Sequence, residues 1–308
     1  MQIDPLLAPV LAQLNSGPPP ASVAELRAGE LATARRIEGT LTSAVPASVR
    51  VRDAVIPGER PIPIRIYTPE GDHLRAGFLF AHGGGWASGS PEAADGHCGD
   101  MAAGADVVIV SVDYRLIPEN PFPAGLDDVS AALTWLSSHA DELGVDAARL
   151  AIGGESAGAN LAAVAAIQAR DAGGPELRLQ LFEVAVLDLT DTMTESRREV
   201  LEQMPDFAHS LEAVRDGYVA AGADPHDPRV SPLLTNDLSG LPTTLLLAAE
   251  VDPVRDDSAA YAQRLTDAGG TARSRTFAGI VHGTETFTLL LPSAREWLQE
   301  CVEALRAV

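Results

Sequence analysis

The sequence contains no lysine, and all 22 of its basic residues are arginine. This absence excludes mechanisms that need a lysine amine, such as a Schiff base, a pyridoxal-phosphate anchor, a Walker phosphate loop or a Ser-x-x-Lys acylase. Aromatic residues are also scarce, at 5% of the chain. Their scarcity favours an α/β body rich in helices over an all-β one.

Cysteine is nearly absent as well, with only Cys98 and Cys301 present. Two cysteines cannot build a disulfide framework, and these two do not have the spacing of metal ligands. The sequence also has no His-Glu-x-x-His motif and no clustered His/Cys set, so we expect no metal. The formal net charge of -21 repels phosphates, so we expect neither nucleic acid nor an anionic membrane as a partner.

Long apolar runs are missing too. No stretch reaches the roughly 18 uninterrupted apolar residues that mark a membrane span. Residues 1–14 lack the basic start of a signal peptide. We therefore expect a cytoplasmic protein without a membrane span, and a homodimer is left open.

Hydrophobic periodicity predicts two helices, at residues 6–14 and 23–38, with a break at residues 17–20 between them. Alternating residues at 49–55 and 62–66 predict two strands that pair antiparallel at a sheet edge. Further strands are expected at residues 78–81, 107–112, 150–153, 177–187, 243–249 and 272–277, and helices at 131–139, 157–171, 256–268 and 293–307.

This alternation of strand and helix predicts a mostly parallel central sheet with helices on both faces. Four segments follow: residues 1–45 are helical, 46–189 form the first part of the core, 190–225 are an insertion, and 226–308 complete the core. The insertion should lie over the carboxyl ends of the strands, where open α/β sheets hold their active sites.

The strongest chemical signal is Gly154-Glu155-Ser156-Ala157-Gly158, which matches Gly-x-Ser-x-Gly between a predicted strand and a predicted helix. A strand-to-helix turn this tight strains the serine backbone and presents its hydroxyl to a cleft. The structural alternative for Ser156 is a helix N-cap. In this context we interpret Ser156 as a catalytic nucleophile.

A second signal is His82-Gly83-Gly84-Gly85-Trp86, directly after a strand. Three glycines let the backbone turn N–H groups into a cavity, as the oxyanion of acyl transfer requires. We assign the oxyanion hole to the N–H groups of Gly84 and Gly85, with Ala157 as third donor. A phosphate loop is the alternative, but Ser88 stands where its third glycine should be.

A serine hydroxyl needs a base and an acid, which in this arrangement follow in the order serine, acid, histidine. Of the histidines after Ser156, His209 lies in the insertion, and His226 lies in a proline-flanked loop without a suitable acid before it. His282 follows the last strand and is the predicted base. Asp252 follows the preceding strand and is the predicted acid, with Glu250 as its rival and Asp256 as a weaker one.

Other residues near these motifs have supporting roles in our interpretation. Trp86 should line the substrate pocket, and Glu155 should brace the turn of Ser156 or the loop near it. His82 should fix the glycine loop by hydrogen bonds. Asp113-Tyr114-Arg115 should hold a local charge pair.

Together these stretches resemble the bacterial hormone-sensitive-lipase-like esterases, also called family IV carboxylesterases, over about residues 50–305. The resemblance also rests on Asp113-Tyr114-Arg115-Leu116, Pro118-Glu119, Phe122-Pro123-Ala124, Asp252-Pro253 and His282-Gly283. It implies the α/β-hydrolase fold, with an eight-stranded, mostly parallel sheet and a helical cap built from residues 1–45 and 190–225. It also implies cleavage of short-acyl esters without a cofactor.

Two positions depart from the family pattern. Glu155 stands where aspartate usually precedes the serine, and Thr284 stands where phenylalanine usually follows His-Gly. Neither departure touches the predicted triad, and both bear on pocket shape and substrate preference.

We therefore predict a serine carboxylesterase that hydrolyses small, uncharged, short-acyl esters through an acyl-enzyme intermediate. A lactone or amide hydrolase is the nearest alternative, because the same groups open those bonds. A non-catalytic binding protein of this fold is a second alternative, but such proteins usually lack a triad member. A peptidase is disfavoured, because the chain carries no extra domain to select peptides.

Overall fold

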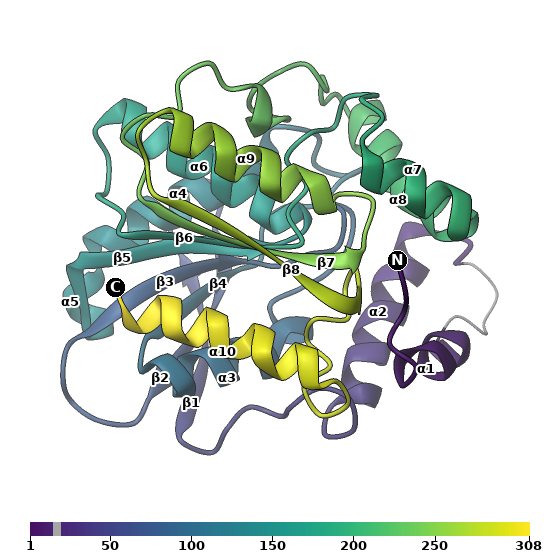
Figure 1. The fold of residues 1–308 in the computed structure, drawn as a ribbon. Helices are drawn as coiled ribbons and strands as arrows, with labels where there is room; N and C mark the ends of the chain where they lie inside the picture. The colour runs from purple at the N-terminus through teal and green to yellow at the C-terminus, as the bar shows by residue number, and fades with distance from the viewer. Residues whose placement is uncertain (15–19) are drawn as a thin grey trace.

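The centre of the molecule is an eight-stranded sheet with the order β1-β2-β4-β3-β5-β6-β7-β8 (Figure 1). The structure is a computed structural model that describes residues 1–14 and 20–308. Most of the break predicted at residues 17–20 therefore lies outside the described residues. The strands are β1 (Val49–Ile56), β2 (Ile62–Pro69), β3 (Arg75–Ala81), β4 (Val108–Val112), β5 (Val145–Glu155), β6 (Leu179–Glu183), β7 (Thr243–Val251) and β8 (Ala272–Val281).

Strand directions follow the hydrophobic patterns of the sequence. The edge strand β1 is buried only at its two ends, Val49 and Ile56, and runs antiparallel to β2, which is antiparallel to β4. All other neighbours are parallel. Strands β3, β4 and β6 are buried along their whole length, as strands covered on both faces must be. The predicted fold, with its antiparallel edge pair, is confirmed.

One strand is shorter than its pattern predicted. Residues 177–187 are apolar enough for a long strand, but β6 contains only Leu179–Glu183. Val184, with φ 42°, turns the chain out of the sheet directly after Glu183. The apolar residues that follow pack in a loop above the sheet instead.

Helices cover both faces of the sheet. Helices α4, α6 and α9 pack on one face, and α3 and α10 on the other (Figure 1). The remaining helices are short or lie at the end of the sheet. The bounds of all the helices are α1 (Leu7–Leu14), α2 (Val23–Ile37), η1 (Glu92–Ala94), α3 (Asp95–Ala105), α4 (Ala124–Ser138), α5 (Ala140–Leu143), α6 (Ala157–Ala172), α7 (Glu195–Gln203), α8 (Pro205–Ala220), η2 (Pro232–Leu234), α9 (Arg255–Asp267) and α10 (Pro292–Arg306). In the described residues, no helix combines the length and apolarity needed to cross a bilayer.

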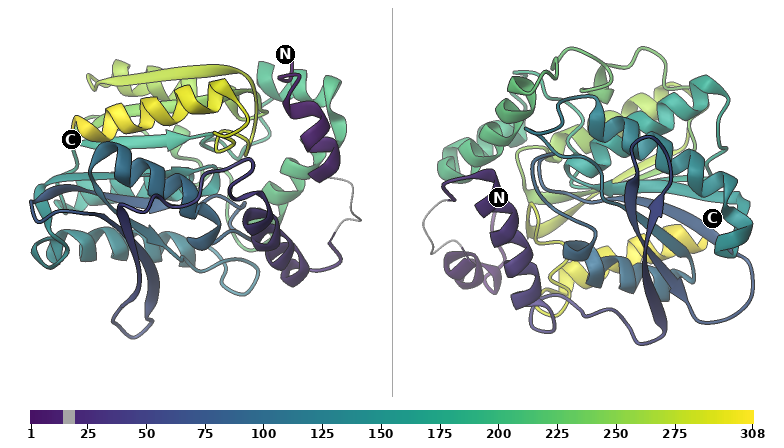
Figure 2. Two further views of the ribbon diagram at one scale, coloured as in Figure 1. Left: turned by 90° about the horizontal axis from the view of Figure 1, so that it is seen from below. Right: turned by 180° about the vertical axis from the view of Figure 1, so that it is seen from behind.

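Helices α1, α2, α7 and α8 gather past the ends of β7 and β8, on the right of Figure 1 and together again in both views of Figure 2. The parallel strands end on this side, so the N-terminal helices and the insertion meet where an open α/β sheet presents its site.

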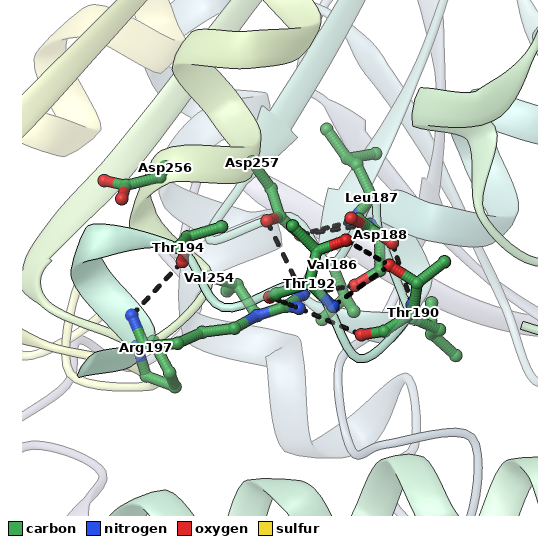
Figure 3. Close-up of polar contacts among 12 residues, drawn as sticks. Val186, Leu187, Asp188, Thr190, Thr192, Thr194, Arg197, Val254, Asp256 and Asp257 are labelled. Atoms are coloured by element: carbon green, nitrogen blue, oxygen red, sulfur yellow. Dashed lines mark hydrogen bonds and ion pairs between the residues drawn. The ribbon is translucent and has the colours of Figure 1, made fainter. Parts of the chain in front are cut away.

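The entry to the insertion is tied to the core by Arg197 of α7. Its guanidinium donates to the carbonyl oxygens of Asp188, Thr190 and Thr192, and lies 3.8 Å from the Asp257 carboxylate (Figure 3). Asp257, on α9, also accepts from the backbone N–H of Asp188. Helix α7 is therefore bonded to the segment that follows β6 and lies beside the first turn of α9.

Candidate active site

Ser156 lies in the tight turn between β5 and α6, with φ 52° and ψ −115°. This backbone conformation is strained for a residue with a side chain. A hydrogen bond of 2.8 Å from the Ser156 N–H to the Glu183 carbonyl holds it. A Cβ at Gly154 or Gly158 would lie 2.2 or 2.0 Å from the Ala81 carbonyl oxygen, so only glycine permits this close packing against β3.

Three predicted residues from separate segments meet at this turn. Ser156 Oγ lies 2.9 Å from Nε2 of His282, which directly follows β8. Nδ1 of His282 lies 2.8 Å from Oδ2 of Asp252, directly after β7. The other oxygen of Asp252 accepts from the backbone N–H of Val254 at 2.9 Å. Asp252 is fully buried, so its orientation is fixed by these bonds.

The electrostatics of the site favour a charged imidazole. Burial alone would lower the pKa of His282, but the charge and hydrogen bond of Asp252, with Glu285 and Glu155, raise it to about 9. The imidazolium that forms when His282 takes a proton is therefore stabilised by its surroundings.

The rival residues lie elsewhere. Glu250 accepts a hydrogen bond from the Gly279 N–H at 2.9 Å, and Asp256 accepts one from the Ser196 N–H at 2.8 Å. His209 is exposed on α8, and His226 is exposed in a loop. Only Asp252, of the three candidate acids, forms a hydrogen bond to the His282 ring.

The glycine loop follows β3. Gly84 has φ 114° and Gly85 has φ 59°, conformations that favour glycine. The Gly84 carbonyl accepts bonds from the Ser88 N–H and hydroxyl, which points the peptide in a fixed direction. Among the described residues, no backbone carbonyl accepts from the N–H of Gly84, Gly85 or Ala157. These are the three N–H groups that the sequence assigned to the oxyanion hole.

A cavity of about 1510 Å³ adjoins these segments. Its floor includes His82, Gly83, Gly84, Glu155 and His282. Apolar side chains of the N-terminal helices and of the α7–α8 corner form its walls, among them Leu11, Leu14, Leu26, Met204 and Phe207. The site thus combines a few polar groups with a largely apolar chamber, as small-molecule sites do.

The supporting residues fall in different places. His82 forms a 2.7 Å hydrogen bond to the Gly83 carbonyl and stacks on Tyr114, consistent with its expected role in the glycine loop. Glu155 lines the cavity. Trp86 is buried, stacks on Tyr218 of α8 at 4.2 Å, and is not among the residues that line the large cavity.

The expected charge pair within Asp113-Tyr114-Arg115 is wrong. Arg115 binds Asp128 of α4 instead, through Nε and Nη2 at 2.8 Å each. The chain turns after β4, and this turn brings Arg115 onto the first turns of α4, where the nearly buried Asp128 also accepts its backbone N–H. The pair joins the segment after β4 to a helix.

Thr284 is a residue whose role the sequence did not reveal. Its hydroxyl donates to the Val281 carbonyl at 2.8 Å and accepts from the Val281 N–H at 3.1 Å, which closes the turn that carries His282. Two buried acids, Glu183 and Glu285, were also missed. Glu183 could have been found as a lone charge inside the apolar strand 179–183, whereas nothing in the sequence marks Glu285.

Comparisons with known proteins agree with this geometry. A family model described as alpha/beta hydrolase fold matches residues 78–286. Carboxylesterase NlhH of Mycobacterium tuberculosis is 39% identical over 262 residues, covering 80% of this chain and 78% of that protein. Ethyl acetate hydrolase of Pseudomonas putida is 34% identical over 255 residues, covering 80% and 78%. A hyperthermophilic esterase from the archaeon Pyrobaculum calidifontis superposes with a TM-score of 0.89 at 33% identity, covering 100% of this chain and 99% of that one.

Proposed function

This chain belongs to the alpha/beta hydrolase fold family, in its hormone-sensitive-lipase-like branch, and is a serine carboxylesterase; on that premise we propose that Ser156, His282 and Asp252 are its catalytic triad. The observation that carries this assignment is the continuous hydrogen-bonded path of 2.9 and 2.8 Å from Ser156 through His282 to Asp252.

In the first half-reaction, Ser156 Oγ forms a bond to the ester carbonyl carbon while its proton moves to Nε2 of His282. The carbonyl electron pair moves onto oxygen, and the N–H groups of Gly84, Gly85 and Ala157 bind that oxyanion. The tetrahedral intermediate then expels the alkoxide. The alkoxide takes the proton from His282 and leaves as the alcohol, so Ser156 remains acylated.

In the second half-reaction, a water molecule gives a proton to His282 and its oxygen attacks the acyl carbon. The second tetrahedral intermediate expels Ser156, which recovers its proton from His282, and the carboxylic acid leaves. Throughout, Asp252 holds the imidazole tautomer and stabilises the imidazolium.

The substrates we propose are small, uncharged, short-acyl esters. The relative from Pseudomonas putida is an ethyl acetate hydrolase by name, which supports a short acyl group. The cavity is lined by the acids Glu25, Glu30, Glu155 and Asp206 and, among the described residues, by no arginine. This lining disfavours anionic esters. Trp86 stays in this proposal as a residue of the substrate pocket, and its ring stacks on Tyr218 of α8.

The cap is a further part of the proposal. Its two pieces are residues 1–45 and 190–225, and the core comprises 46–189 and 226–308. Support comes from the cavity, whose walls include residues of α1, α2 and the α7–α8 corner. The cytoplasmic location, the absence of nucleic-acid binding and the homodimer stay predictions.

Lactone or amide hydrolysis is the second activity that the same groups could perform, but the relatives reported above are named for esters. The purified protein should therefore hydrolyse p-nitrophenyl butyrate with a higher kcat/KM than γ-butyrolactone or butyranilide. Ser156→Ala should reduce kcat on the ester by a factor on the order of 10⁴–10⁶, because the triad acts as a unit. Ser239→Ala, which replaces an exposed serine, is the control. Ester cleavage that survives Ser156→Ala would reassign the nucleophile.

A further inference from the structure

Two glutamates flank the proposed catalytic residues and meet each other in the interior. Glu155 directly precedes Ser156 at the end of β5, and Glu285 follows His282 in the turn after β8. Their carboxyl groups lie close enough to share a hydrogen bond. Glu285 is only 1% exposed. The contact therefore joins the turn that carries the nucleophile to the turn that carries the base.

Ordinary donors do not account for this contact. Apart from its own backbone N–H, no N–H or hydroxyl donor of the described residues reaches the buried oxygens of Glu285. An ionised carboxylate only accepts hydrogen bonds, so two ionised glutamates cannot bond to each other. A hydrogen bond between them needs a proton on one carboxyl.

A third acid, Glu183, completes the neighbourhood and behaves differently. Glu183 lies opposite Glu155 in the parallel pairing of β5 with β6. Its carboxylate is bonded to Nε2 of His97 at 2.9 Å, Nε1 of Trp297 at 2.6 Å and Sγ of Cys301 at 3.4 Å. Burial would raise the pKa of Glu183, but the charge and hydrogen bond of His97 lower it. Glu183 is therefore ionised and adds a negative charge beside the pair.

The charged groups that act on the pair are thus Glu183 from β6, His97 from α3 and His282 from the turn after β8. Burial raises the pKa of Glu285 well above its ordinary value, and the charge of Glu155 raises it further. Burial and the charge of Glu183 likewise raise the pKa of Glu155. Two carboxyls in contact, one buried and one at the cavity wall, titrate as one unit, and the form with one proton is favoured at neutral pH.

We propose that Glu155 and Glu285 share one proton, that this hydrogen bond holds the Ser156 turn against the His282 turn, and that the remaining negative charge stabilises the His282 imidazolium. Both are positioning residues. Glu155 also reaches the glycine loop, since a Cβ at Gly83 would lie 2.9 Å from its Oε1. Glu155 thus stands next to the nucleophile and reaches two more of the four segments that the proposed reaction uses, the glycine loop and the His282 turn.

The shared proton can be observed without any substrate. Infrared spectroscopy in D₂O at about pH 7 detects the carbonyl stretch of a protonated carboxyl. Buried Asp257, whose pKa burial raises to about 7, contributes to that region, so difference spectra against variants are needed. Glu285→Gln and Glu155→Gln should each remove a protonated-carboxyl band that Glu59→Gln, on an exposed turn, leaves unchanged. If neither variant removes a band, both glutamates are ionised and the proposal is overturned.

Kinetics test the second half of the proposal, which rests on the proposed triad. Each single Gln variant keeps one donor and one carboxylate, so it should keep kcat/KM within about 3-fold and leave the acid limb of the pH profile in place. The double variant E155Q/E285Q loses the charge. Its acid limb should move down by about one pH unit, and the plateau value of kcat/KM above that limb should fall about 10-fold. If the acid limb of the double variant lies at the same pH as that of the unaltered protein, the negative charge of the pair does not stabilise the His282 imidazolium.

The two readouts separate the possible failures. A missing infrared band overturns the shared proton whatever the activity. If the band is present but Ser156→Ala retains activity, the catalytic assignment is at fault and the shared proton stands. If the double variant does not fold, single variants at each position replace it. Glu155→Ala or Glu285→Ala should reduce kcat/KM more than the Gln variant at the same position, because alanine cannot form the hydrogen bond. Equal activity of the Ala and Gln variants would overturn the positioning role.

Discussion

The hydroxyl of Ser196 donates a hydrogen bond of 2.8 Å to the carbonyl oxygen of Pro253, the residue after Asp252. Ser196 lies in the first turn of α7, in the insertion, so the insertion is bonded to the loop that orients the proposed catalytic acid. Asp256 strengthens the connection by accepting from the Ser196 N–H.

Ser196→Ala removes this bond and leaves a buried carbonyl without its donor. The free energy of unfolding should fall by about 1 kcal/mol, and kcat/KM should fall several-fold because Asp252 loses its brace. Ser130→Ala is the matched control, since Ser130 donates a similar bond to Gln168 between α4 and α6. Urea unfolding and ester kinetics measure both. A kinetic loss in the control equal to that in Ser196→Ala would remove the special role of this contact.

The choice of catalytic acid can be tested with two isosteric changes. Asp252→Asn should lower kcat by about 10⁴-fold, because the amide favours the wrong imidazole tautomer. Glu250→Gln should stay within a few-fold of the unaltered enzyme, because Glu250 binds the Gly279 N–H rather than the imidazole. Steady-state kinetics on one chromogenic ester decides the matter, and the opposite ranking would make Glu250 the acid.

The pH dependence of the enzyme should reflect His282. Its pKa is raised to about 9, and it can accept a proton from Ser156 only when neutral. We therefore expect kcat/KM to rise with pH until about 9, after subtraction of spontaneous ester hydrolysis. A plateau reached near the ordinary histidine pKa of about 6.5 would show that the surrounding carboxylates do not act on His282.

Close packing at the nucleophile turn should make Gly158 intolerant of a side chain. A Cβ there would lie 2.0 Å from the Ala81 carbonyl oxygen and 2.4 Å from that of His82. Gly158→Ala should therefore cost about 1–3 kcal/mol or more and displace the glycine loop. Gly29→Ala is the control, since a Cβ at Gly29 in α2 meets no atom within 4 Å and should stabilise that helix by up to about 1 kcal/mol. Equal melting temperatures for the two variants would contradict this packing.

The fold could be predicted from the sequence because periodicity and turn chemistry agree along most of the chain. A Gly-x-Ser-x-Gly motif between a strand and a helix predicts the tight turn that carries Ser156. Helix α3 was not predicted, because Gly96, Gly99 and Gly104 weaken its pattern. Its glycines instead allow close packing, as at Gly104, where a Cβ would lie 2.7 Å from Val302 of α10.

Contacts between side chains that are far apart in the chain could not be predicted from the sequence. The triad members could be proposed because each follows a strand end in a fixed order. Arg115 was assigned to its neighbour Asp113 because local spacing was the only guide, whereas its partner Asp128 comes from the next helix. Glu155 and Glu285 meet only because β5 and β8 are parallel and both end at the carboxyl end of the sheet.

The most direct test of the account is to map where an organophosphate binds covalently. Diethyl p-nitrophenyl phosphate phosphorylates an activated serine and releases one p-nitrophenol per site. Peptide mass spectrometry of the treated protein should place a single diethylphosphoryl group on Ser156, and His282→Ala should slow its formation by several orders of magnitude. A group found on another hydroxyl, or formed equally fast without His282, would contradict the central claim.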